Sequence, residues 1–485
     1  MKTPSVMHKD QARATLLNEL REAVGAQHVV TNPAMQDKYL TDWRGLCNGR
    51  ALAVVLPGCT EEVAAIVSAC GRVGAPVVPQ GGNTGQVAGA TPDQTGTAVV
   101  LVLSRMQRVR SLDIENATIT VEAGCVLQTV QEAAHAAGLL FPLSLGAEGS
   151  CTIGGNLATN AGGTQVLRYG NARELALGLE VVLASGETWN GLRGLRKNNT
   201  GYDLRNLMIG SEGTLGVITA ATLRLFPLPK AQCTALVAVA SIGLTGAFLS
   251  RCRSGFDASL TAFELMSGAC MQLVAQAFPQ QRQAFIALDA PWYVLLELSD
   301  SEGATHARER FESLLGEALE DGQITDVAIA QTLAQSEAMW HARESITLAL
   351  ARDGKCIKHD ISLSVSAIPA FVQNTDALLQ ARFSGVRNFT FGHLGDGNLH
   401  YNVAHAPGTT DAVLLAQQPA LSELVHDAVH ALQGSISAEQ GIGRQRTNDL
   451  RRYKDPVELR MMASIKHALD PMNIMNPGVL LSLPS

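Results

Sequence analysis

The sequence predicts an α+β protein, in which a glycine-rich first part is followed by a part where long helices alternate with strands. Of its 485 residues, 46% are hydrophobic and only 5% are aromatic, and 45 are glycines. This composition is typical of a globular protein with many tight turns. The length suits about two or three domains with large cores.

The first part opens with a helical lead-in over residues 1–50 and continues as a β-α-β unit. Residues 53–56 form a strand, and the helix that follows has one apolar face. Gly74 and Pro76 stop that helix before a second strand at residues 77–79. The further elements expected are strands at residues 99–103, 109–114 and 118–122 and a helix at residues 126–137.

The composition changes after residue 229, where glycine becomes rarer and strands such as residues 292–298 and 356–365 alternate with helices. Residues 231–250 have no charge and the length of a membrane span. They divide, however, into a strand at residues 235–240 and the start of a helix, so we expect no integral membrane segment. The domains expected are residues 1–230 and 231–430, followed by a C-terminal segment at residues 431–485.

Charge and cysteine content exclude several classes of protein. A net charge of -7 and a pI near 6.0 argue against a nucleic-acid partner. The nine cysteines are scattered and form no C-x-x-C motif, which indicates buried thiols in a reducing compartment. The N-terminus has no apolar signal core, and we therefore expect a cytoplasmic protein.

The dipeptide Asp396-Gly397 predicts a hairpin with a two-residue type I′ turn. Counting outward from that turn places His393 opposite His400, with their Cβ atoms about 5 Å apart on one face. Asn402 projects from the same face. Two imidazoles so placed can share one metal ion, and the alternative is a hydrogen-bonded histidine pair in an ordinary hairpin.

Glu439 offers a third ligand, because residues 435–438 form a short strand and Glu439 stands where that strand meets a glycine-rich turn. Two histidines and one carboxylate form the ligand set of catalytic zinc sites. The same set also fits non-haem Fe(II), and the spacing does not choose between the two metals.

The first part contains glycine-rich loops at residues 79–85, 149–163 and 210–216. The loop at residues 79–85 follows a buried strand, and its consecutive glycines let backbone N–H groups converge on an anion. It has neither the Walker A pattern nor the G-x-G-x-x-G fingerprint. One such loop is most often a structural turn, but three in one domain indicate backbone wrapped around a large phosphate-bearing cofactor.

Residues 339–350 read as one helix, on which Arg343 and Thr347 are four apart and share a face. Lys358 lies on the strand that follows, where polar and apolar residues alternate. A solvated helix face and an edge-strand lysine are the alternative to an anion site.

Together with residues 195–203 (Leu-Arg-Lys-Asn-Asn-Thr-Gly-Tyr-Asp), these loops, the histidine hairpin and the Glu439 turn resemble the vanillyl-alcohol oxidase / p-cresol methylhydroxylase superfamily. From about residue 40 to the end, the chain is similar to its FAD-dependent D-2-hydroxyacid dehydrogenase branch, and most of all to the D-2-hydroxyglutarate dehydrogenases. The resemblance implies a two-part FAD-binding domain of the p-cresol methylhydroxylase type and a ferredoxin-like antiparallel-sheet cap domain.

The resemblance also implies FAD, bound non-covalently because the loops at residues 79–85 and 146–163 contain no histidine. The pyrophosphate would lie on residues 81–85. The residues expected to bind FAD are Gly81, Gly82, Asn83, Thr84, Gly85, Gly146, Ser150, Thr152, Gly155, Asn156, Thr159, Asn160, Gly162, Gly213, Gly216, Ile218 and Asn476.

By the same pattern His393, His400 and Glu439 would hold a divalent metal, which we expect to be Zn²⁺, and would be catalytic together with Gln440. Because the metal would bind the hydroxyl and its adjacent carboxylate, a separate pair of cations favours a second carboxylate on the substrate. The residues expected to bind substrate are Arg343, Thr347, Lys358, Asn402 and Gln440.

The activity implied is oxidation of a D-2-hydroxy acid such as D-2-hydroxyglutarate or D-malate to the 2-oxo acid, by hydride transfer from C2 to FAD N5. Electrons would pass to an acceptor such as electron-transfer flavoprotein or a quinone, and we expect a homodimer. The alternatives are a D-lactate or glycolate dehydrogenase and a non-catalytic flavoprotein subunit.

The sequence departs from the family at residue 440, where the family has a histidine that is its general base. Gln440 carries an amide, which cannot act as a base near neutral pH. The base would then be His359, His405 or a metal-bound hydroxide, or the reaction would be slower, and the sequence leaves these alternatives open.

Overall fold

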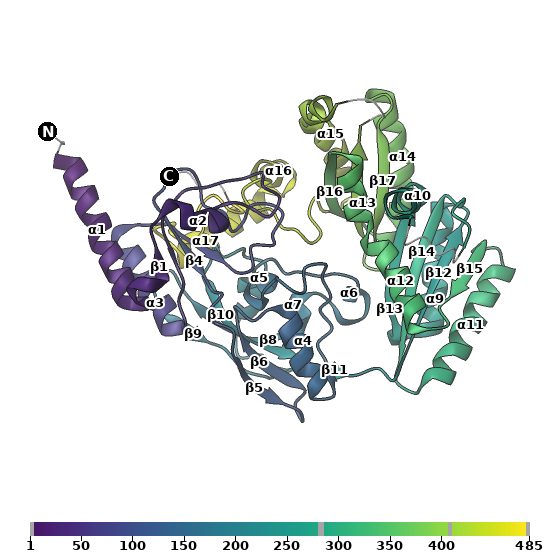
Figure 1. Cartoon of the computed structure of the whole chain (residues 1–485), viewed down its shortest axis with the longest axis horizontal. Coiled ribbons are helices and arrows are strands. Elements are labelled where there is room, and N and C mark those ends of the chain that lie inside the picture. Colours follow the sequence, from purple (N-terminus) through teal and green to yellow (C-terminus); the bar gives the residue numbers. More distant parts are fainter. Residues whose placement is uncertain (1–3, 280–285, 406–409, 482–485) are drawn as a thin grey trace. The chain divides into compact units, whose positions relative to one another are not determined.

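The computed structural model describes residues 4–279, 286–405 and 410–481, and the chain divides into two compact units. The second unit consists of Gly162–Gly170 and Leu228–Ala438, and the first unit contains the remainder of the chain. In Figure 1 the first unit combines purple and blue segments with the yellow C-terminal helices, and the second unit is mostly teal and green. The unit boundaries lie at residues 227/228 and 438/439, compared with the expected 230/231 and 430/431, and Gly162–Gly170, part of a predicted cofactor loop, belongs to the second unit.

Two sheets form the centre of the first unit, and the predicted β-α-β unit lies in one of them. A four-stranded sheet has the order β1-β2-β4-β3, in which β2, β4 and β3 are parallel. A five-stranded antiparallel sheet has the order β5-β6-β10-β8-β9. The strands are β1 (Val29–Val30), β2 (Ala51–Val55), β3 (Val77–Gln80), β4 (Ala98–Val102), β5 (Val109–Asp113), β6 (Thr118–Glu122), β8 (Ala176–Val182), β9 (Thr188–Asn190) and β10 (Val217–Arg224), with β7 (Leu139–Leu140) and β11 (Phe226–Pro227) as a separate pair.

Helix α3 (Thr60–Val73) joins the two sheets into one core. Glu61 and Glu62 lie in its first turn, where they oppose the helix dipole favourably. Gly74 ends it at φ 66°, as predicted, and donates its N–H to the Cys70 carbonyl. Its apolar face packs with residues of both sheets in one buried cluster. The other helices of this unit are α1 (Pro4–Val24), α2 (Pro33–Leu40), α4 (Leu127–Ala136), α5 (Ile153–Ala158), α7 (Ala172–Leu175), α8 (Leu204–Met208), α16 (Thr447–Tyr453) and α17 (Pro456–Leu469).

The C-terminal segment closes the first unit by extending its parallel sheet. Met475 forms a parallel bridge with Val77 of β3, so residues from opposite ends of the sequence pair. The buried Lys466 of α17 fixes this segment, because its ammonium donates to the carbonyls of Thr214 and Met475 and to the Asp470 carboxylate. Burial lowers the pKa of Lys466, and Asp470 opposes that shift.

The second unit is built on a seven-stranded sheet with the order β15-β12-β14-β13-β17-β18-β16, in which every pairing is antiparallel. The strands are β12 (Ala231–Val239), β13 (Leu260–Ser267), β14 (Trp292–Asp300), β15 (Asp326–Ile329), β16 (Cys356–Ser362), β17 (Arg387–His393) and β18 (Asn398–Ala404). The helices are α6 (Val166–Tyr169), α9 (Ile242–Phe256), α10 (Gly268–Ala277), α11 (Ala304–Glu320), α12 (Leu333–Glu344), α13 (Ile346–Asp353), α14 (Ile368–Arg382) and α15 (Asp411–Ala431).

Helices cover both faces of this sheet. On one face, α10, α12 and α13 pack with Met266, Leu295 and Phe391 in a single buried cluster. On the other face, Phe248 of α9 contacts Phe263, and Phe371 of α14 contacts Tyr401. The first face, which also carries the histidine hairpin, is called the site face below. The antiparallel sheet and its helices confirm the predicted α+β class.

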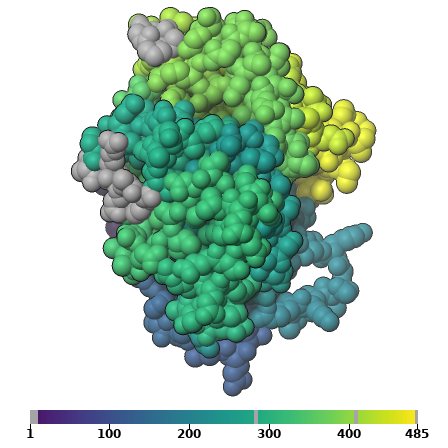
Figure 2. All heavy atoms as spheres, turned by 90° about the vertical axis from the view of Figure 1, so that its right-hand side faces the viewer, coloured from purple at the N-terminus to yellow at the C-terminus, as the bar shows by residue number. Residues whose placement is uncertain are grey.

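Two further findings bear on the sequence predictions. Residues 231–250 form β12 and most of α9, and no helix in the described part of the chain is long and apolar enough to cross a membrane. Residues 195–203 form an exposed loop, in which the Tyr202 side chain is 96% exposed. In Figure 2, blue-teal atoms of this part of the sequence project from the surface.

Candidate active site

The histidine hairpin forms, but with a different register from the one predicted. Phe391, and not His393, lies opposite His400, and the connection runs over residues 394–397. The predicted two-residue turn is therefore wrong, although Gly397 does adopt a left-handed φ of 88°. Side chains alternate with a period of two, so a shift of two residues leaves both histidines on one face. Their ring centroids are 5.6 Å apart.

The strand register places each histidine opposite a carboxylate. Glu264 of β13 lies directly across from His393, and Asp360 of β16 lies directly across from His400. The four side chains therefore form a row over four adjacent strands on the site face. His393 Nδ1 is 2.7 Å from Glu264 Oε1, and His400 Nδ1 is 3.6 Å from Asp360 Oδ1.

Glu439 completes a possible ligand set. The predicted strand at residues 435–438 is reduced to a single bridge between Ser435 and Ser362. The Ala438 N–H nevertheless donates to the Asp360 carbonyl, 3.2 Å away, which fixes the chain beside β16 just before Glu439. One ligand atom each from His393, His400 and Glu439 lies within 4.8 Å of the others. This donor set fits a zinc ion or another divalent ion with an open coordination position.

Glu264 is fully buried and joins the hairpin to the predicted anion site. Its Oε2 accepts hydrogen bonds from Arg343 Nε at 3.0 Å and Arg343 Nη2 at 2.8 Å, while its Oε1 faces His393. Burial on its own raises the pKa of Glu264. The charges of His393 and Arg343, with the hydrogen bonds that they donate, outweigh burial and hold that pKa below its ordinary value.

The predicted substrate residues lie close to this row, with one difference in the helix. The helix expected over residues 339–350 is interrupted at Ser345, so the buried Arg343 lies in the last turn of α12 and the exposed Thr347 lies in the first turn of α13. Lys358 lies opposite Asn402 and therefore on the site face. The Asn402 amide donates to the carbonyls of Phe389 and His400, which fixes its side chain in place.

The two histidines considered as general bases, and Gln440 in the place of the family's base, each have partners of their own. His359 is on the face opposite the histidine pair, where its ring nitrogens contact the Tyr401 carbonyl and the Ser422 hydroxyl. That position removes it from the site face, because adjacent strand residues point to opposite sides. His405 lies beyond the end of β18 and pairs with Asp411. The Gln440 amide oxygen accepts a 3.4 Å hydrogen bond from Arg446.

The predicted cofactor loops of the first unit lie against one another. A Cβ at Gly81 would overlap the Thr152 hydroxyl, and one at Gly82 would overlap the Ser150 carbonyl. Glycine is therefore required in the first loop because the second loop passes so close. Asn83 and Asn160 adopt left-handed φ angles of 54° and 52°, a conformation that non-glycine residues rarely adopt outside functional loops and turns.

Asn476 and Glu212 join the loops to the C-terminal segment. Asn476 Nδ2 donates to the carbonyls of Gly89 and Glu212 at 2.8 Å each. The Glu212 carboxylate accepts the N–H groups of Ile442 and Gly443, also at 2.8 Å. Burial raises the pKa of Glu212, and these two N–H groups oppose that shift.

Buried polar atoms on these loops support a bound cofactor. Within the described ranges, Thr152 Oγ1 and Asn476 Oδ1 are buried without a hydrogen-bond partner. Such atoms are costly unless a ligand or water satisfies them. Gly85 and Gly146 face open space, so backbone N–H groups and small side chains are available to a large ligand there. These features fit the phosphates and polar edges of FAD.

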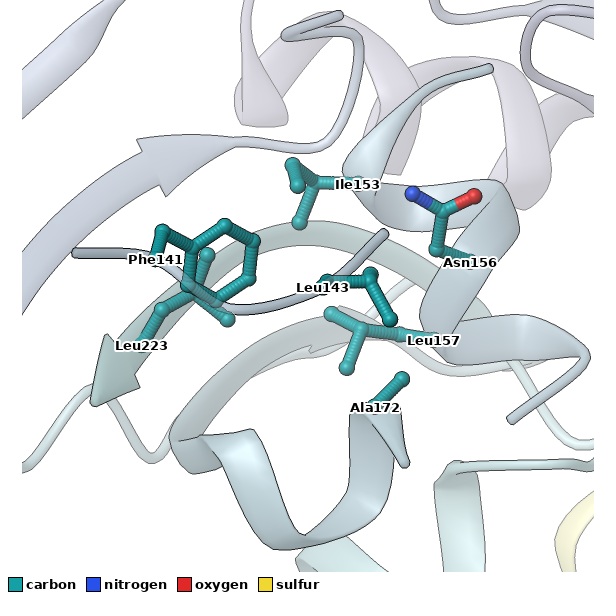
Figure 3. A pocket seen from close by; sticks show the side chains of 7 residues that line it. All are labelled: Phe141, Leu143, Ile153, Asn156, Leu157, Ala172 and Leu223. Atoms are coloured by element: carbon teal, nitrogen blue, oxygen red, sulfur yellow. The ribbon is translucent and has the colours of Figure 1, made fainter. Parts of the chain in front are cut away.

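Helix α5 packs against a small pocket that is lined mostly by apolar side chains. Figure 3 shows the side chains that line it, which come from α5, α7, β10 and the segment after β7. Asn156 is the one polar residue among them, and Ile153 and Leu157 turn toward the same space. The packing anchors α5, which carries the predicted FAD residues Gly155 and Asn156. The remaining predicted FAD residues belong to the first unit as well, except Gly162, which begins the segment assigned to the second unit.

Sequence reasoning missed Glu264 and Glu212. Glu264 is the one charged residue of β13, whose other residues are apolar or hydroxyl-bearing. An isolated carboxylate in a buried strand is costly unless it is paired, and this was the available signal. Glu212 lies inside the predicted loop at residues 210–216, which was recognised by its glycines alone, and no pattern in that loop pointed to the glutamate.

Comparison with known proteins agrees with this arrangement. The FAD binding domain family matches residues 51–191, and the C-terminal domain family of FAD linked oxidases matches residues 228–480. D-2-hydroxyglutarate dehydrogenase of Xanthomonas citri pv. viticola is 39% identical over 95% of this chain and 96% of that protein. The mitochondrial D-2-hydroxyglutarate dehydrogenase of Bos taurus is 38% identical over 95% of this chain and 82% of its own length.

A solved structure of p-cresol methylhydroxylase with substrate bound has the same fold, with a TM-score of 0.76 at 14% identity over 96% of each chain. The fold, the two family matches and the identity to the two dehydrogenases agree with one another. The chain belongs to the FAD-linked oxidases and, within them, to the FAD-dependent D-2-hydroxyacid dehydrogenases of the D-2-hydroxyglutarate dehydrogenase type.

Proposed function

We propose that the protein oxidises a D-2-hydroxy acid with a second carboxylate, such as D-2-hydroxyglutarate or D-malate, to the 2-oxo acid. One observation carries the proposal: the two histidines of the possible metal site and the cation of Lys358 occupy the same face of one sheet, and a Glu439 oxygen lies close to both histidines. Lys358 lies opposite Asn402, two residues from His400 along β18. That step along a strand is about 6–7 Å, which suits a short acid with a carboxylate at each end.

The side chains of the site face bind and orient the substrate in this proposal. Lys358 supplies a point charge for the distal carboxylate, and Arg343 adds a second cation, which lies over the Phe391 ring on the same sheet face. A divalent ion, when held by His393, His400 and Glu439, supplies a Lewis acid for the hydroxyl group and its adjacent carboxylate, and zinc suits this ligand set. FAD, when bound by the glycine-rich loops of the first unit, supplies the acceptor for the hydride that leaves C2.

Gln440 has a supporting role in this proposal. Its amide neither takes nor gives a proton near neutral pH, so it contributes hydrogen bonds only. Arg446 donates to its oxygen and thereby orients the amide. Gln440 thus orients the substrate beside Glu439, and the hydroxyl proton leaves by another route.

Anaerobic reduction of the flavin tests the proposal. The purified, FAD-loaded protein is mixed with D-2-hydroxyglutarate, D-malate, D-lactate or glycolate, and bleaching of the flavin absorbance is followed by stopped flow. We expect the two dicarboxylates to bleach the flavin fastest and the L-enantiomers to leave it oxidised. Turnover with an artificial acceptor dye should follow the same order, whichever acceptor, such as electron-transfer flavoprotein or a quinone, works in the cell.

The outcomes separate the competing functions. Faster bleaching by D-lactate or glycolate would replace the dicarboxylate with a short monocarboxylate as the substrate. No bleaching by any hydroxy acid, with the flavin bound and metal present, would favour a non-catalytic flavoprotein subunit.

A further inference from the structure

The buried Glu264 carboxylate is shared between two parts of the proposed site. Oε1 lies 2.7 Å from His393 Nδ1, and Oε2 receives Nε and Nη2 of Arg343. Arg343 is itself buried, and its guanidinium also lies over the Phe391 ring, 4.9 Å from the centroid. A carboxylate can only accept hydrogen bonds when it is ionised, so each oxygen has a fixed role.

The contact with His393 has a direct chemical consequence. A carboxylate at Nδ1 requires the ring proton on Nδ1, and Nε2 is then the nitrogen left to bind a metal. Partners of this kind fix the ring orientation and raise the basicity of metal-binding histidines. The direct cross-strand pairing of Glu264 with His393 means that the sheet itself sets this geometry.

The contact with Arg343 uses the other oxygen of the same group. Moving the carboxylate would therefore move the metal ligand and the guanidinium together. A buried ion pair is weak grounds for stability, because desolvation offsets most of the attraction. A role in orientation accounts better for a charge placed at the centre of this sheet.

We propose that Glu264 is a positioning residue that holds the His393 ring with Nε2 available for the metal and holds the Arg343 guanidinium for the substrate. This inference rests on the proposed function, since it needs His393 to bind a metal. Asp360 stands in the equivalent place beside His400, but at 3.6 Å and with its Oδ1 already bound by Asn398 Nδ2 at 2.9 Å. Glu264 therefore has the stronger hold on its histidine.

Glu264→Gln is the sharpest variant, because the amide has one acceptor and one donor end. The donor end would face either the Nδ1 proton of His393 or the N–H groups of Arg343, so at most one of the two contacts survives. Glu297→Gln is the matched control. Glu297 is a buried glutamate on the same sheet face, and it accepts hydrogen bonds from Trp340, Thr261 and Gln232 rather than from a histidine.

The main measurement is zinc affinity, which does not depend on activity. The FAD-loaded protein is stripped of metal, and its zinc Kd is measured by competition with a chromogenic chelator. We expect Glu264→Gln to weaken zinc binding about 10–100-fold, and Glu297→Gln to keep the wild-type Kd. The FAD content of both variants should match the wild type.

The two failures are distinguishable. Wild-type protein without zinc affinity would remove the metal from the proposed function. Tight zinc binding by the wild type that Glu264→Gln leaves unchanged, or that both variants weaken equally, would overturn the role of Glu264 alone.

A measurement on the wild type covers the case in which Glu264→Gln does not fold. In zinc-loaded protein labelled with ¹⁵N-histidine, the His393 resonances are assigned by their loss in His393→Gln. We expect a protonated Nδ1 and a zinc-bound Nε2. The opposite tautomer would overturn the proposal.

Discussion

The two units of this protein present their candidate ligand-binding groups in different ways. In the first unit the predicted FAD loops offer backbone and small side chains, and glycines allow loops such as residues 81–85 and 149–155 to touch. In the second unit a regular sheet offers charged side chains, and each histidine stands opposite a carboxylate. The candidate site of the first unit depends on glycines, whose lack of a side chain lets the loops approach one another. The candidate site of the second unit depends on which side chains lie opposite each other on neighbouring strands.

Because of this difference, we expect the two candidate sites to respond differently to substitutions. Removing one side chain from the sheet should abolish chemistry and leave the fold, because neighbouring strands keep the backbone in place. Adding a side chain at a loop glycine should lower the stability of the fold or the affinity for FAD, because the added atoms would occupy space that a neighbouring loop or the cofactor needs. The four predictions below test that contrast, from the largest expected effect to the smallest.

The metal ligands should show the largest effect. His393→Gln, His400→Gln and Glu439→Gln each remove a ligand, and a Lewis acid is worth several kcal/mol of transition-state stabilisation. We expect turnover to fall roughly 10³-fold or more, with an unchanged flavin spectrum. His359→Gln is the control, since it replaces a buried histidine on the opposite face of the same sheet. A metal-free preparation with full activity would contradict the metal site.

Lys358→Ala should come next and should depend on the substrate. Loss of one partner of a desolvated charge pair costs about 2–5 kcal/mol, so kcat/KM for D-2-hydroxyglutarate should fall about 30- to 4,000-fold. D-lactate has no distal carboxylate and should lose much less. Lys355→Ala, at an exposed lysine just before β16, is the matched control. Equal losses for both acids would mean that Lys358 binds the carboxylate that they share.

Replacing loop glycines with alanine should change either the stability of the protein or its affinity for FAD. Gly82→Ala places a methyl group against the Ser150 carbonyl, whereas Gly85→Ala places one in open space. We expect Gly82→Ala to destabilise the FAD-free protein by about 1–3 kcal/mol and to lower its Tm. Gly85→Ala should keep that Tm and weaken FAD binding, measured by fluorescence titration. Identical behaviour of the two variants would show that loop contacts and cofactor contacts are not separable.

Gln440 should show the smallest effect. Gln440→Ala removes hydrogen bonds worth about 1 kcal/mol, so its loss of rate should be far below that of Glu439→Gln. Gln440→His adds an imidazole that titrates near pH ~6.5 when unperturbed. It should add a pKa in that range to the pH profile of kcat/KM. A Gln440→Ala protein as inactive as Glu439→Gln would mean that the amide is indispensable for orienting the substrate.

The sequence predicted several local features of both candidate sites, because the signals for those features are local. Glycine spacing identified the loops, and the alternation of polar and apolar residues placed Lys358 on a strand. The hairpin prediction had the wrong register, yet its error of two residues preserved the face of His393 and His400. Family resemblance, and not spacing, assigned the individual FAD residues.

What the sequence could not predict depends on contacts between distant segments. Glu264 and His393 are 129 residues apart, and no local pattern shows that β13 and β17 are neighbours. The interruption of the helix at Ser345 could not be predicted either, because the residues before and after it continue one helical pattern. The exchange of Gly162–Gly170 into the second unit also arises only from packing.

The bridge between Val77 and Met475 has a consequence for biosynthesis. A ribosome completes β3 early, but the segment that pairs with it, together with Asn476, is made almost four hundred residues later. The second unit is continuous apart from Gly162–Gly170 and can begin to fold while the first still lacks one edge of its parallel sheet. The predicted FAD loops thus gain their contacts with Asn476 only near the end of translation.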